Sequence, residues 1–290
     1  MSRYAFFLGC TAPVRTMNYE LSTRRVAEKL GIELVDFPFT CCGFPIEPIN
    51  QDSAIMMSMR NLALAESKGL DIVTLCSACA GTLTRFNKIL REDKKSRTNL
   101  ANNLSRGLEY RGSVKVKHFV RMLYEDIGIP KLKGMISKNL KGLKLLTHYG
   151  CHYIRPSEIY NGFDYPEAPH TLDELVEITG AESLDFPQRD MCCGAALLAI
   201  DKNITLTMAE SKLQMAKAAG ADALVVICPF CGISYDMGQL EIEIEFHRKY
   251  NLPVLYYPQL LGLAMGLHPK DLALMMNNVK VQKILDKVLM

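Results

Sequence analysis

Residues 34–43 read LVDFPFTCCG and residues 184–194 read LDFPQRDMCCG, so one pattern occurs twice in the chain. In each copy an apolar segment leads through Phe-Pro to two adjacent cysteines and a glycine. A single cysteine precedes each copy and a Cys-x-x-Cys motif follows it, in FLGC (7–10) and IVTLCSAC (72–79), and in THYGC (147–151) and VVICPFC (225–231). The same three motifs therefore recur in the same order, and they contain all 10 cysteines.

The spacing of these motifs indicates an internal duplication. Thirty residues separate Cys10 from Cys41, and forty separate Cys151 from Cys192. The gap from the cysteine pair to the Cys-x-x-Cys motif is 33 residues in the first copy and 34 in the second. The segments around the motifs also match, 57–76 with 208–228 and 114–128 with 252–266. A duplicated domain explains the repeat, and we expect one domain over residues 1–140 and another over residues 141–290.

Short apolar segments alternate with amphipathic ones in both copies. The expected strands are 4–8, 33–37, 72–75 and 114–117 in the first copy, and 143–148, 183–186, 223–227 and 254–257 in the second. Helical patterns between them include 21–30, 54–68 and 204–219, and the polar segment 87–111 is expected to form a helical excursion at the surface. Such alternation predicts an α/β fold with two homologous parallel-sheet halves related by a pseudo-twofold axis.

Every cysteine motif comes directly after one of the expected strands. In parallel α/β sheets the carboxyl ends of the strands form the ligand-binding edge. Three loops of each half would therefore bring five thiols to one place. Gly43 and Gly194, which follow the cysteine pairs, allow the backbone to approach a bulky ligand closely.

Composition limits the classes of partner. The 290 residues include 34 basic and 31 acidic ones, for a net charge of +3, which gives no reason to expect nucleic acid or an anionic membrane as a partner. The start of the chain lacks the long apolar region of a signal peptide. Prolines interrupt the longest apolar segment, 252–266, and no direct membrane span is expected. We therefore expect a cytoplasmic protein.

Ten cysteines in such a protein favour metal binding over disulfides, because the cytosol keeps thiols reduced. Zinc in one of the halves is one alternative, since a tetrahedral zinc site needs four such ligands. Five cysteines per half exceed that number, and the usual cysteine run of a cubane cluster is absent from the sequence. Five thiolates suggest a cluster with more ligand positions, a bridging thiolate or a nonstandard iron arrangement.

The duplicated cysteine pattern resembles the cysteine-rich CCG-domain family. The opening YAFFLGC (4–10) and the segment HYGCH (148–152) are similar to the B-type subunits of heterodisulfide reductases. The resemblance covers nearly the whole chain and implies one noncubane [4Fe–4S] cluster in each half. The ligands that it implies are Cys10, Cys41, Cys42, Cys76 and Cys79 for the first cluster, and Cys151, Cys192, Cys193, Cys228 and Cys231 for the second.

The resemblance also implies an activity and partners. It implies a catalytic subunit that reduces the disulfide of coenzyme M and coenzyme B to two thiols, with the disulfide lying between the two clusters. Because the sequence has no flavin or ferredoxin motif, electrons are expected from a ferredoxin-like iron–sulfur subunit and a flavin-containing subunit of the same complex. The alternatives are an iron–sulfur subunit of a succinate/fumarate, lactate or glycolate oxidoreductase, and a non-catalytic electron-transfer subunit.

A few polar residues near the cysteine motifs are further candidates for the site. The substrate named by the resemblance carries anionic groups, so Arg15, Arg155 and Lys202 are candidates for binding it. His148 and His152 are candidates for supplying protons to the leaving thiolates. For the basic residues a solvated surface charge is the competing explanation, and for His148 it is a structural role within a strand.

Overall fold

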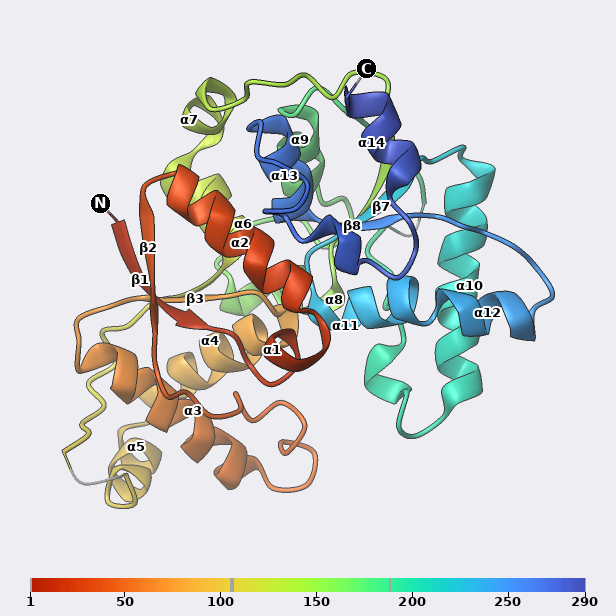
Figure 1. The fold of residues 1–290 in the computed structure, drawn as a ribbon. Helices are drawn as coiled ribbons and strands as arrows, with labels where there is room; N and C mark the ends of the chain where they lie inside the picture. Colours follow the sequence, from red (N-terminus) through yellow and green to blue (C-terminus); the bar gives the residue numbers. More distant parts are fainter. Residues whose placement is uncertain (1, 105–106, 188, 290) are drawn as a thin grey trace.

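The computed structural model describes residues 2–104, 107–187 and 189–289. The chain forms two four-stranded parallel sheets with the same topology, ordered β2-β1-β3-β4 and β6-β5-β7-β8 (Figure 1). The part of the chain around each sheet is called the first half and the second half below. The prediction of two homologous parallel α/β halves is confirmed.

The elements follow one another in the order that the sequence pattern predicts. The first half contains β1 (Ser2–Phe7), α1 (Ala12–Arg15), α2 (Met17–Lys29), β2 (Ile32–Asp36), α3 (Gln51–Glu66), β3 (Ile72–Thr74), α4 (Ser77–Glu92), α5 (Lys94–Ala101), β4 (Val116–His118), α6 (Phe119–Met122) and α7 (Ile129–Gly134). The second half contains β5 (Lys144–His148), α8 (Cys151–Ile154), α9 (Thr171–Glu177), β6 (Glu182–Ser183), α10 (Lys202–Ala218), β7 (Ala223–Val226), α11 (Pro229–Gly232), α12 (Gln239–Glu245), β8 (Val254–Tyr256), α13 (Tyr257–Ala264) and α14 (Gln282–Leu289). Helix α11 continues into a π-helical turn, Ile233–Met237.

The inner strands β3 and β7 are fully buried in their sheets, as is usual for parallel strands. The helices that follow the cysteine pairs begin in the same way in both halves. The Asn50 side chain accepts a hydrogen bond from the Ser53 N–H at the start of α3, and Asp201 accepts one from the Ile204 N–H at the start of α10.

The two halves are joined through reciprocal contacts of their last strands. Tyr256, at the end of β8, stacks on Tyr19 of α2 with ring centroids 4.2 Å apart. His118, at the end of β4, meets Tyr153 of α8 edge-on at 5.2 Å. Figure 1 shows α2 of the first half beside α13 of the second. The carboxyl ends of the strands of both sheets therefore face the junction between the halves.

The polar segment 87–111 contains the end of α4 and all of α5, as expected of a helical excursion, although residues 105–106 lie outside the described part of the chain. Within the described residues, no helix combines the length and the apolarity that are needed to cross a membrane.

Candidate metal centre

The cysteines lie at the carboxyl ends of the strands and at helix starts. Cys10 follows β1 and Cys151 follows β5. Cys76 precedes the first residue of α4, and Cys228 precedes the first residue of α11. The amino end of a helix carries a partial positive charge, which favours the thiolate form of a cysteine placed there. All ten cysteines are free thiols.

The first cysteine set forms an unbroken series of thiol contacts. Neighbouring thiols shift one another's pKa in the order Cys10, Cys41, Cys42, Cys79 and Cys76. Exposure decreases along this series, from the exposed Cys10 to the buried Cys42, Cys79 and Cys76. The set thus runs from the surface to the junction between the halves.

The second cysteine set repeats the arrangement. Its contacts run in the order Cys151, Cys192, Cys193, Cys231 and Cys228. The last three of these thiols are buried. The three innermost thiols are therefore buried in both halves, whereas Cys10 is exposed and its equivalent Cys151 is half-buried.

The two sets meet at their buried ends. The Sγ atoms of Cys76 and Cys228 are 4.0 Å apart across the junction. The ten thiols thereby form one continuous series through both halves. This juxtaposition could not be derived from the order of the motifs.

Interactions between neighbouring thiols shift their pKa values in opposite directions. Two accepted hydrogen bonds, the larger effect coming from Cys41, lower the pKa of Cys42 to about 4. The pKa of Cys192 is lowered to about 2 in the same way, first by Cys151, and that of Cys228 is also lowered, first by Cys231. Interaction with neighbouring thiols, together with burial, raises the pKa of Cys10, Cys79 and Cys231. Since only thiolates bind metals, loading these sets must release the shared protons.

Glycines allow the backbone to pass close to the thiols and to neighbouring helices. Gly43 has φ +99°, and a Cβ there would lie 2.6 Å from the Ala54 carbonyl oxygen. A Cβ on Gly9 would lie 3.0 Å from the Cys79 sulfur. A cavity of about 30 Å³ is lined by all five thiols of the first set and by Phe230 of the second half. A group larger than one ion therefore requires the thiols to spread, while five soft sulfur donors fit iron–sulfur chemistry well.

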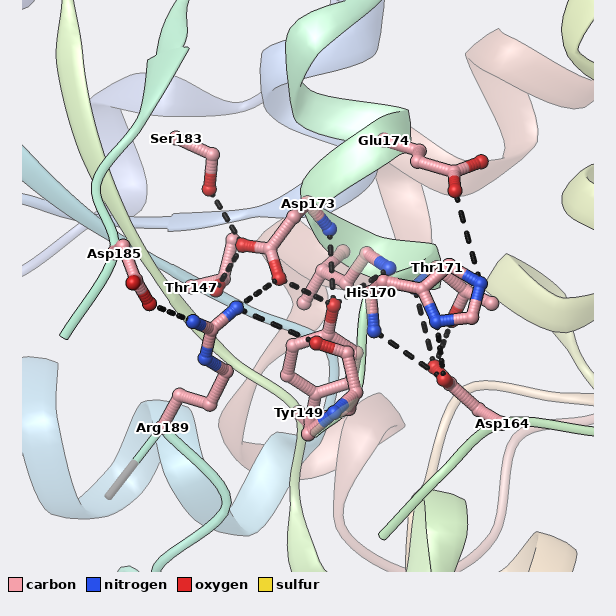
Figure 2. Close-up of polar contacts among 12 residues, drawn as sticks. Thr147, Tyr149, Asp164, His170, Thr171, Asp173, Glu174, Ser183, Asp185 and Arg189 are labelled. Carbon is pink, nitrogen blue, oxygen red and sulfur yellow. Dashed lines mark hydrogen bonds and ion pairs between the residues drawn. The ribbon is translucent and has the colours of Figure 1, made fainter. Parts of the chain in front are cut away.

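A largely buried carboxylate, that of Asp173, holds the loops of the second set. Figure 2 shows the Asp173 carboxylate accepting hydrogen bonds from Thr147 (2.7 Å), Tyr149 (2.6 Å), Ser183 (2.6 Å) and Arg189 (2.8 Å). Tyr149 lies two residues before Cys151, and Arg189 lies three residues before Cys192. Asp173 thus connects the two loops that present these thiols. Asp164 similarly fixes the start of α9 by accepting from Thr171, at 2.6 Å from its hydroxyl.

His148 lies beside the second set with no hydrogen-bond partner on either ring nitrogen among the described residues. A ring nitrogen and the Sγ atoms of Cys193 and Cys231 lie within 4.8 Å of one another, all buried. Burial, and secondarily the charge of Lys212, lower the pKa of His148 to about 3. The imidazole is therefore neutral near pH 7 and has one N–H to donate and one nitrogen to accept.

His152 and Arg155 lie along an open groove of about 460 Å³ that also includes Cys151. The His152 ring packs edge-on against Phe44, which follows the cysteine pair of the first half, at 5.1 Å. Burial lowers the pKa of His152. Arg155 forms an ion pair with Asp190 and donates to the Pro166 carbonyl at 3.1 Å, so part of its charge is already compensated.

The other two predicted basic residues lie elsewhere. Arg15 is exposed at the end of α1. Lys202 is exposed at the start of α10 and pairs with Glu241 at 3.0 Å. Neither lines the cavity of the first set or the groove beside Cys151. Their role in binding a substrate stays a prediction.

The structure adds residues that the motifs did not indicate. Lys212 is 2% exposed and occupies the apolar face of α10. His118 donates from Nε2 to the carbonyl oxygens of Leu75 (3.0 Å) and Ile227 (2.8 Å), one in each half. The sequence could have indicated that Lys212 is buried, because it shares the helical spacing of the apolar residues Ala209, Leu213 and Ala216. No pattern in the sequence indicated the role of His118.

Comparison with known proteins agrees with this geometry. The family model of the CCG cysteine-rich domain matches residues 4–84 and 145–236. The chain is 37% identical to the B subunit of the ferredoxin/F(420)H(2)-dependent CoB-CoM heterodisulfide reductase of Methanosarcina acetivorans, over 99% of this chain and 97% of the relative. It is 30% identical to the 8-methylmenaquinol:fumarate reductase membrane anchor subunit of Wolinella succinogenes, over 97% and 98%.

A solved structure shows the same fold. A hypothetical protein from Helicobacter pylori superposes with a TM-score of 0.79 at 16% identity, over 97% of this chain. The chain spans about half of that protein, 52%. The names of the relatives include subunits of multi-subunit reductases and support iron–sulfur clusters as the class of cofactor. The chain is therefore a duplicated member of the cysteine-rich CCG family, related along its length to the B-type subunits of heterodisulfide reductases.

Proposed function

We propose that the chain is the catalytic subunit of a heterodisulfide reductase that reduces the disulfide of coenzyme M and coenzyme B to two thiols. In this proposal residues 1–140 and 141–290 each hold one noncubane [4Fe–4S] cluster through their five cysteines. The observation that carries the proposal is the 4.0 Å approach of Cys76 and Cys228, which places the two cysteine sets end to end. A small disulfide bound beside this junction would lie near both sets.

The chemistry requires two electrons and two protons for each disulfide that is cleaved. Iron–sulfur clusters supply electrons one at a time, so two adjacent sites match the demand of one disulfide. His152 lies between the halves, beside Cys151 and against Phe44. This position suits it to orient the substrate and to deliver a proton to a leaving thiolate. The flavin-containing and ferredoxin-like subunits of the complex would supply the electrons.

The test uses anaerobically purified protein with an artificial one-electron donor and measures the thiols released from the coenzyme M–coenzyme B disulfide. Cys42→Ala and Cys193→Ala should each abolish turnover while iron is retained at the untouched set. Adding a thiol should change the spectrum of the clusters, because an accessible iron is needed to bind sulfur. Near-normal turnover with one intact set would refute the proposal.

A second candidate function follows from the relative named as a fumarate reductase subunit. In that case the chain would serve as an iron–sulfur electron-transfer subunit of another redox complex. The same preparation distinguishes the two candidate functions. Rapid oxidation of the reduced clusters by a quinone, with no thiol released from the disulfide, would favour the second candidate.

A further inference from the structure

The two cysteine sets have different polar neighbours at equivalent positions. Phe7 of β1 pairs with Thr74, and His148 of β5 pairs with Val226. Thr74 and Val226 each precede the first cysteine of the Cys-x-x-Cys motif by two residues. The first half therefore has an apolar phenyl ring where the second has the His148 imidazole, whose nitrogens have no described partner and lie near two thiols.

A second pair of positions differs by a charge. Gly43 packs on Ala54 of α3 and Gly194 on Thr205 of α10, which makes these helices equivalent. Seven residues further along each helix stand Asn61 and Lys212.

The roles of these two side chains differ. Asn61 is neutral and holds the loop of the cysteine pair, accepting from the Thr40 N–H at 2.9 Å and donating to the Cys41 carbonyl at 3.0 Å. Lys212 is 2% exposed, with its Nζ 4.6 Å from the centre of the Phe186 ring. It brings a cation into the interior at the equivalent place.

A third pair lies four residues after the last cysteine of each set. Leu83 stands there in the first half and Tyr235 in the second. Tyr235 is fully buried, meets the His148 ring edge-on at 5.0 Å, and has a hydroxyl without a hydrogen-bond partner among the described residues. The second set therefore has a buried cation where the first has the neutral Asn61, and two polar side chains where the first has Phe7 and Leu83.

The other basic residues near the cysteines do not distinguish the sets, because each half has ion pairs there. Arg155 contacts Asp190 near the second set, and Arg85 contacts Glu47 near the first. Burial differs only at the first cysteine, because Cys10 is exposed and Cys151 is half-buried, whereas three thiols of each set are buried. The buried Lys212, with the His148 and Tyr235 donors, distinguishes the interior surroundings of the second set from those of the first.

We infer, as an extension of the proposed function, that Lys212, His148 and Tyr235 raise the reduction potential of the second cluster above that of the first. Reduction adds negative charge, which a nearby buried cation stabilises strongly because the interior has a low dielectric constant. Hydrogen bonds to cluster or ligand sulfur act in the same direction. The first electron that enters the pair therefore resides on the second cluster.

The experiment is a potentiometric titration of the iron-loaded full chain, monitored by electron paramagnetic resonance without substrate. The Cys42→Ala variant identifies the signal of the second cluster. Lys212→Met should shift that signal to a lower potential by at least a tenfold change in the reduction equilibrium, which is 59 mV for a one-electron couple. His148→Phe and Tyr235→Phe should shift it in the same direction and leave the first signal unchanged.

Lys217→Met is the matched control, because Lys217 is an exposed lysine of the same helix, and it should shift neither signal. Equal potentials in the unaltered protein, or a Lys212→Met variant that shifts neither signal or both equally, would overturn the inference and leave the proposed function intact. A chain without iron would instead overturn the proposed function. Should His148→Phe lose its second cluster, the Lys212 and Tyr235 variants decide the outcome.

Discussion

Single residues at the junction show how local chemistry fixes the site. His118 is buried, accepts the Val120 N–H on Nδ1 at 3.2 Å and donates from Nε2 to a carbonyl of each half. Only a neutral imidazole satisfies all these contacts. Burial lowers the pKa of His118 to about 4. This residue therefore joins the segments that lead into Cys76 and Cys228.

The pH dependence of stability should reflect His118. The pKa of His118 in the folded protein is about 4, below the ordinary value of 6.5. Its contribution to the free energy of unfolding is therefore complete above pH 6.5 and is lost as the pH falls towards 4. We expect this residue to account for about 2 kcal/mol of lost unfolding free energy between pH 7 and pH 5. In anaerobic denaturant titrations, the His118→Gln variant should lose about 2 kcal/mol less unfolding free energy between pH 7 and pH 5 than the unaltered chain does. His247→Gln, which changes an exposed histidine, should show the same pH dependence as the unaltered chain.

A glycine beside the first cysteine pair gives a second test at this scale. Gly43→Ala combines a positive φ with a Cβ 2.6 Å from the Ala54 carbonyl oxygen, and should lower the free energy of unfolding by about 3 kcal/mol. Gly31→Ala, at φ +71° with open space around its Cβ, should cost only about 1 kcal/mol. Equal losses in denaturant titrations would show that the close approach of α3 to the cysteine loop is unimportant.

Among the elements, α9 has the clearest influence on the candidate site. Its Asp173 receives hydrogen bonds from β5, β6 and the loop that leads to the second cysteine pair (Figure 2). The side chain is only 13% exposed. A short helix without cysteines therefore sets the position of two thiol-bearing loops.

Removal of this carboxylate should loosen the second set selectively. Asp173→Ala leaves Arg189 partly buried without this partner, and we expect a loss of about 3 kcal/mol in unfolding free energy together with a lower iron content. Asp185→Ala is the control, because Asp185 also pairs with Arg189 but is 89% exposed, and it should change stability by less than about 0.5 kcal/mol. An Asp173→Ala protein with full stability and full iron would contradict this role.

At the scale of the whole molecule, duplication produces two cysteine sets that meet rather than two separate sites. The contacts of Tyr19 with Tyr256 and of His118 with Tyr153 hold the halves face to face. The sets then form one series of ten sulfurs. Their function should therefore depend on both halves together.

Metal content tests this arrangement directly. We expect about eight irons per chain, with matching acid-labile sulfide, if each half holds a four-iron cluster. Iron, sulfide and zinc should be assayed on the same anaerobic sample. One zinc and four irons in a fully active preparation would rule out two four-iron clusters and would indicate that one half binds zinc.

The sequence determined the duplication, the cysteine sets and the parallel α/β character of both halves, because apolar periodicity and motif order are local properties of the chain. All eight strands were predicted to within a few residues. The expected strand 183–186 is shorter in the structure, Glu182–Ser183, where it pairs with β5 over two residues. Helix α2 begins at Met17 rather than Leu21, because Asn18 and Tyr19 are buried against the second half.

Only the tertiary structure decided how the two sets relate. The approach of Cys76 to Cys228 joins residues 152 positions apart, and no local pattern encodes such a contact. The same holds for the compensation of Arg155 by Asp190 and for the unpartnered nitrogens of His148 beside buried thiols, within the described residues. The electrostatic environment of a buried group depends on every element packed around it, so side chains distant in sequence distinguish two sites that the cysteine motifs make identical.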